Sequence, residues 1–113
     1  EALDCGRKLL DGLDNLSALT EALCQRYGIQ QVLVHTIHET LLRTPDGLTR
    51  EKTRFVAQPR ISTGAGDHFN GASCFALLAG LSDRDRVHFA GVFASTYVSK
   101  GSTPTLDEVL DAL

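Results

Sequence analysis

The sequence predicts an α/β fold, in which a mainly parallel sheet is flanked by helices and carries a β-hairpin. An amphipathic helical segment, residues 16–27, leads into a short apolar run at residues 31–35. That order is typical of half a βαβ unit. Further along, a glycine-rich turn at residues 62–66 leads into a series of helical segments. Both observations indicate helices that pack on a sheet.

Two helical segments are predicted before residue 28. Residues 3–13 carry leucines at helical spacing. In residues 16–27 the apolar positions recur every three or four residues, at Leu16, Leu19, Leu23 and Tyr27. Asn15 or Ser17 can cap the start of this second helix, and Gly28 fits the left-handed residue that ends it.

The apolar run Gln31–His35 is predicted to be a buried parallel strand, because it is short, apolar and bounded by polar residues. Residues 40–44 and 48–52 flank the tripeptide Pro45-Asp46-Gly47. Proline presets φ and glycine accepts a positive φ, so this tripeptide favours a turn. The sequence therefore predicts a hairpin here.

Three helices are predicted after the glycine-rich turn. The first runs from just after Asp67 to about residue 79, the second covers residues 83–99, and the last covers residues 106–113. Gly101 ends the second helix, and Thr105 caps the last one.

Composition and charge exclude several classes of function. With 113 residues the chain has room for one domain. The net charge is −3 and no basic stripe is present, which argues against a nucleic-acid partner. No apolar run is long enough to cross a bilayer, and nothing at the start is typical of a signal peptide. The three cysteines, Cys5, Cys24 and Cys74, have no paired spacing, so we expect reduced thiols in a cytoplasmic protein without membrane contact.

The run from Ser62 to Gly71, Ser-Thr-Gly-Ala-Gly-Asp-His-Phe-Asn-Gly, carries the clearest functional signal. A glycine-rich turn that opens a helix leaves backbone N–H groups unpaired at the positive end of the helix dipole. Such donors bind anions, most naturally a phosphate. Asp67 would stand at the rim, where a carboxylate can take a proton from an attacking hydroxyl. These residues suggest phosphoryl transfer. His68 is expected to be exposed to solvent or to be a residue of the turn.

This run resembles the C-terminal signature of the ribokinase-like (PfkB) carbohydrate kinases, Asp-Thr-x-Gly-Ala-Gly-Asp-x-Phe. The segment from about Thr44 to Leu113 reads like the end of such a kinase. The resemblance implies a partial Rossmann-like (ribokinase-like) sheet, with ATP and Mg²⁺ as cofactors. It also implies that Asp67 is the catalytic base and that the anion hole is formed by Gly64, Ala65 and Gly66.

The resemblance also points to further contacts with ATP or ADP, at Thr63, Asn70, Thr36 and Gly101. In the family the region around Gly101 borders the adenine, and Gly91 and Ser95 would let a flat base approach. The chain departs from the family at two places. Ile61 replaces the first acid of the signature, so a monovalent cation is not expected there. The glycines of a Thr-x-Gly-x-x-Gly turn are missing near Thr36.

Members of the family are much longer than this chain. We therefore expect residues 1–113 to be the C-terminal nucleotide- and phosphate-binding portion of a kinase, without its N-terminal substrate-binding portion and inactive alone. The expected reaction is ATP-dependent phosphoryl transfer to a hydroxyl of a sugar or sugar-like substrate. The alternatives are a non-catalytic nucleotide- or phosphate-binding module, and a structural part that associates with another chain, including a homo-oligomer.

His35, His38 and Glu39 are spaced for a metal, but no third distant ligand stands out, so no protein metal site is predicted.

Overall fold

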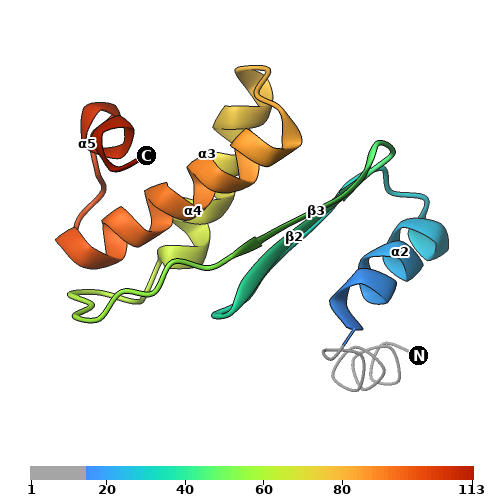
Figure 1. The fold of residues 1–113 in the computed structure, drawn as a ribbon, viewed down its shortest axis with the longest axis horizontal. Helices are drawn as coiled ribbons and strands as arrows, with labels where there is room; N and C mark the ends of the chain where they lie inside the picture. Colours follow the sequence, from blue (N-terminus) through green and yellow to red (C-terminus); the bar gives the residue numbers. More distant parts are fainter. Residues whose placement is uncertain (1–14) are drawn as a thin grey trace.

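The computed structural model describes residues 15–113. The expected helix at 3–13, Cys5 and the chain start lie outside the described residues. Within them the elements follow one another as α2 (Leu16–Tyr27), β1 (Val32–His35), β2 (Glu39–Thr44), β3 (Gly47–Lys52), α3 (Ala65–Leu78), α4 (Asp83–Lys100) and α5 (Leu106–Ala112). Figure 1 shows the hairpin of β2 and β3 between α2 on one side and the α3–α4 pair on the other.

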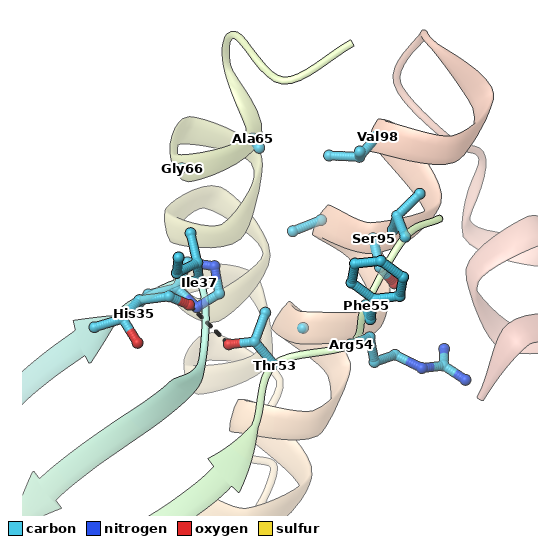
Figure 2. A pocket seen from close by; sticks show the side chains of 13 residues that line it. His35, Ile37, Thr53, Arg54, Phe55, Ala65, Gly66, Ser95 and Val98 are labelled. Atoms are coloured by element: carbon cyan, nitrogen blue, oxygen red, sulfur yellow. Dashed lines mark hydrogen bonds between the residues drawn. The ribbon is translucent and has the colours of Figure 1, made fainter. Parts of the chain in front are cut away.

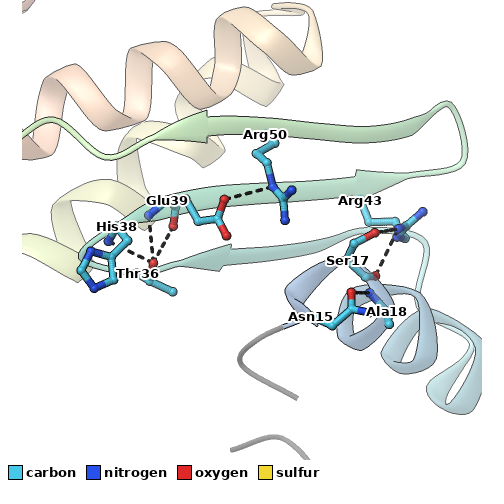
Figure 3. Close-up of polar contacts among 8 residues, drawn as sticks. All are labelled: Asn15, Ser17, Ala18, Thr36, His38, Glu39, Arg43 and Arg50. Atoms are coloured by element: carbon cyan, nitrogen blue, oxygen red, sulfur yellow. Dashed lines mark hydrogen bonds and ion pairs between the residues drawn. The ribbon is translucent and has the colours of Figure 1, made fainter. Parts of the chain in front are cut away.

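Helix α2 forms as predicted and is tied to the sheet by polar contacts. The side chain of Asn15 caps it by accepting from the Ala18 N–H at 3.1 Å, and Gly28 ends it with φ +61°. From β2, Arg43 donates to the Ser17 carbonyl at 3.1 Å (Figure 3). It also donates to the Thr20 hydroxyl at 3.1 Å. These bonds fix α2 against one face of the sheet.

The strands run in directions that differ from the predicted, mainly parallel sheet. In the described residues the sheet has three strands in the order β1-β2-β3, and both pairings are antiparallel. The connections explain this direction, because residues 36–38 join β1 to β2 and residues 45–46 join β2 to β3. Links this short reverse the chain, whereas parallel neighbours need a crossover of a dozen residues or more. The strand at 32–35 is therefore antiparallel to its described neighbour.

The predicted hairpin is confirmed. Thr44 pairs with Gly47 across the turn, and Leu42 pairs with Thr49. Leu41 and Leu42 point to opposite faces of β2 and are both fully buried. Burial of consecutive residues requires cover on both faces of the strand, which α2 and α4 supply.

The last three helices agree with the prediction, with one shift. Helix α3 begins at Ala65, earlier than the expected start after Asp67, because Gly64 is its N-cap at φ +87°. Gly101 ends α4, and Thr105 starts α5 with a capping box. The small residues of α3 allow α4 to pack closely. The core of this helical layer consists of Phe69, Ala72, Ala76, Phe89, Ala90, Val92, Ala94 and Val109.

Candidate active site

The turn that opens α3 presents unpaired backbone donors. The Ala65 N–H donates to the Ser62 carbonyl at 3.2 Å, and the His68 N–H donates to the Gly64 carbonyl at 3.1 Å. The N–H groups of Gly64, Gly66 and Asp67 have no acceptor among residues 15–113. They lie at the positive end of a 14-residue helix, where an anion is stabilised by both the donors and the dipole.

The donor set differs in one respect from the anion hole that the resemblance implies. The N–H of Ala65 already closes the turn onto Ser62. Gly64 and Gly66 keep free donors, and Asp67 adds another through its own backbone. The Ala65 position therefore shapes the turn, while its neighbours carry the available N–H groups.

A cavity of about 470 Å³ adjoins this turn. Figure 2 shows how it opens between the start of α3, the loop after β1, the segment after β3 and one side of α4. Its lining consists of His35, Thr36, Ile37, Thr53, Arg54, Phe55, Val56, Ala65, Gly66, Gly91, Ala94, Ser95 and Val98. Gly91 and Ser95 therefore lie in the same hollow as Gly66.

Thr36 holds the loop at one wall of the cavity. Its hydroxyl donates to the Glu39 carbonyl at 2.9 Å and accepts from the Glu39 N–H at 3.0 Å (Figure 3). The Thr53 hydroxyl donates to the Thr36 carbonyl at 2.8 Å. Hydroxyl groups thus order a turn that lacks the glycines of the family pattern.

His35 forms part of the same cavity wall, and its ring has a shifted pKa. Its Nδ1 lies 2.7 Å from the hydroxyl of the buried Thr40. His35 is exposed overall, but partial desolvation of its ring lowers its pKa from the usual 6.5, because desolvation disfavours the charged imidazolium. Above pH 6.5 this wall therefore carries a neutral ring.

Asp67 lies in the first turn of α3, next to the cavity-lining Gly66. Its side chain is exposed and forms no hydrogen bond or ion pair within residues 15–113. The carboxylate is thus free to accept a proton from a group that reaches the rim of the turn.

Three of the predicted nucleotide contacts do not line this cavity. Thr63 is exposed, and its carbonyl accepts from the Tyr97 hydroxyl at 2.8 Å. Asn70 is exposed on α3. Gly101 ends α4 at φ +84°, where a Cβ would lie 3.2 Å from the Cβ of Arg60. Only Thr36 of the four predicted positions lines the hollow.

The motif did not reveal the residues behind the turn. Tyr97 has the spacing of an apolar helix stripe, yet its hydroxyl reaches the turn. His68 is half-buried rather than at the surface, and it stacks on Tyr97 with ring centroids 3.7 Å apart. His68 directly follows Asp67 in the sequence, whereas Tyr97 lies 34 residues after Thr63, so no local pattern links the two side chains to the same turn.

Within residues 15–113, no group of three or more His, Cys, Asp or Glu side chains is placed to hold a metal ion. No helix in that range has the length and apolar character needed to cross a membrane.

Comparison with known proteins identifies the class and then the family. The chain superimposes on ribokinase from Thermotoga maritima with a TM-score of 0.75 and 26% sequence identity, over 87% of this chain and 34% of that one. The fold is therefore of the ribokinase-like α/β class of carbohydrate kinases, and the chain spans about a third of the ribokinase's length. A family model described as prokaryotic ketohexokinase matches residues 7–113. The chain belongs to this family. No curated protein sequence matches it.

Proposed function

We propose that this chain supplies the phosphate-binding turn and the base of a kinase that transfers a phosphoryl group from ATP to a sugar hydroxyl. The observation that carries the proposal is the group of free N–H donors at Gly64, Gly66 and Asp67, next to a cavity of about 470 Å³. The family adds the substrate class, and its description makes a ketohexose the first acceptor to test. The free thiols of Cys24 and Cys74 fit a reducing cytoplasm.

The residues present fit a nucleotide. The cavity has the size of ordinary small-molecule sites, and the small side chains of Gly91, Ala94 and Ser95 leave room for a flat base. Magnesium would be held mainly by phosphate oxygens, as is usual for this ion at nucleotide sites. ATP would supply the phosphoryl group, and its magnesium would offset the negative charge.

The chain's own groups then have two tasks. Asp67 accepts the proton of the attacking hydroxyl, since its carboxylate is exposed and has no partner in the described part of the chain. The N–H groups of Gly64, Gly66 and Asp67 stabilise negative charge that grows on the phosphoryl oxygens, together with the dipole of α3.

The binding part of the proposal is tested by a pair of glycine variants on one helix. Gly66 and Gly71 both lie in α3 without positive φ, and a Cβ at either would meet nothing within 4 Å. Gly66→Val places its methyl groups at the cavity wall, whereas Gly71 is not part of that wall. Calorimetric titration with MgATP should show saturable binding by the wild-type chain and by Gly71→Val, and none by Gly66→Val.

Equal binding by the two variants would contradict the proposed phosphate site. A folded wild-type chain that binds neither MgATP nor MgADP would instead favour a structural role in association with another chain.

The catalytic part is tested in a full-length kinase that contains this sequence. Asp67→Asn should leave MgATP binding nearly unchanged and lower turnover about 100- to 10,000-fold, the usual contribution of a general base. Turnover within a few-fold of the wild type would show that Asp67 is not the base.

A further inference from the structure

We propose that Tyr97 and His68 are positioning residues, which hold the turn at residues 63–66 so that its N–H groups keep the direction needed for phosphate. This inference rests on the proposed function, because it concerns the same turn. Neither side chain belongs to the glycine-rich signature, in which position 68 is open to any residue.

Tyr97 acts on the peptide group between Thr63 and Gly64. Its hydroxyl donates to the Thr63 carbonyl at 2.8 Å, and the side chain is only 7% exposed. In a trans peptide the carbonyl and the following N–H point in opposite directions, and residues 15–113 contain no cis peptide. By holding the carbonyl, Tyr97 therefore turns the Gly64 N–H away from α4.

His68 acts on the next peptide group along the chain. Its Nδ1 lies 2.7 Å from the Gly64 carbonyl, which can only accept, so Nδ1 carries the hydrogen. Its Nε2 lies 2.9 Å from the Thr103 hydroxyl, in the segment between α4 and α5. The ring thus joins the turn to a second, distant part of the chain.

The two side chains also support each other. Their rings are stacked with centroids 3.7 Å apart and an angle of 16° between the planes. The rings form a layer behind the turn, and from it hydrogen bonds reach the carbonyls of Thr63 and Gly64. Consecutive peptide groups held in this way cannot rotate independently, so the donors on the turn are preorganised.

Gly64 makes this close approach feasible. A Cβ at residue 64 would lie 3.0 Å from the Tyr97 hydroxyl oxygen, and the residue has φ +87°. The motif glycine therefore meets two demands in this chain, a left-handed backbone and space for a tyrosine.

The test compares Tyr97→Phe with Tyr27→Phe, the same change at the chain's other tyrosine, on the remote α2. Tyr97→Phe removes only the hydroxyl and keeps the ring stacked on His68. Two readouts are used: hydrogen exchange and ¹H–¹⁵N shifts of Gly64, Gly66 and Asp67 without ligand, and MgATP affinity by calorimetry. We expect altered exchange and shift at Gly64, and an affinity weaker by roughly 3- to 10-fold, in Tyr97→Phe alone.

A second pair separates positioning from plain stability. His68→Asn keeps a donor near the place of Nδ1, whereas His68→Leu removes both ring nitrogens. The affinity for MgATP should stay near the wild-type value in His68→Asn and fall in His68→Leu. Both are measured at a temperature well below the midpoint of thermal unfolding of each variant.

The inference would be overturned if Tyr97→Phe changed neither the hydrogen exchange and chemical shift of the Gly64 amide nor the affinity for MgATP. If the wild-type chain binds no MgATP, the proposed function fails in this chain. The ligand-free exchange at Gly64 then still decides whether Tyr97 orients the turn.

Discussion

The imidazole of His35 lies flat on the phenyl ring of Phe69, with ring centroids 4.0 Å apart and planes inclined by 10°. Phe69 is fully buried in the core, while His35 lines the cavity. The stack joins the end of β1 to the second turn of α3. The position of the glycine-rich turn relative to the cavity wall is therefore set by core packing.

Truncating this contact should cost stability. Phe69→Ala removes a fully buried aromatic side chain and should lower the free energy of unfolding by about 3–5 kcal/mol. Phe75→Ala on the same helix is the control, since Phe75 is 52% exposed and should cost much less. Urea denaturation of both variants measures the difference, and equal losses would show that the core is not centred on Phe69.

The stability of the chain should depend on pH through His35. Its folded pKa is below 6.5, so at acid pH the unfolded chain binds more protons at this site than the folded chain. Stability contributed by the neutral ring is complete above pH 6.5 and is lost as the pH falls through 6.5 towards the folded pKa. His35→Asn keeps an amide nitrogen near Thr40 but does not titrate.

We therefore expect wild type to lose more stability than His35→Asn between about pH 7 and about pH 5. His38→Asn, at an exposed position on the same loop, controls for the loss of one histidine. If the free energy of unfolding changed with pH in the same way in wild type and in His35→Asn, this would contradict the lowered pKa of His35.

The glycine before α3 should be less replaceable than the glycine after α2. Gly64 and Gly28 both have positive φ, but only Gly64 has a neighbour, the Tyr97 hydroxyl, close to its missing Cβ. Gly28→Ala should cost about 1 kcal/mol from backbone strain, and Gly64→Ala about 1–2 kcal/mol more from the added contact.

Thermal or urea unfolding measures both glycine variants. Adding Tyr97→Phe to Gly64→Ala should recover part of the loss, since it removes the atom that crowds the new methyl group. No recovery would mean that backbone strain alone makes Gly64 necessary.

Much of the local structure could be predicted from the sequence because its signals are short-range. Helix α2 follows from an apolar stripe with Asn15 and Gly28 at its ends, and the hairpin follows from the turn at Pro45–Asp46. The start of α3 was placed too late, because Gly64 caps that helix through its backbone conformation rather than through a side chain. The predicted parallel direction was not confirmed, because the three strands within residues 15–113 are antiparallel and a single apolar strand does not reveal its partner.

For the site, the sequence by itself determined the turn and its resemblance to the ribokinase-like kinases. The first N–H groups of any helix lack an acceptor within that helix, so the local signals for a helix start at residues 64–67 already imply free donors. Only the tertiary structure decided that Gly66 shares a cavity with Thr36 and Ser95, and that Tyr97 and His68 hold the turn from behind. These contacts join residues far apart in the chain, and they form because packing of α3 on α4 and the sheet brings their backbones together.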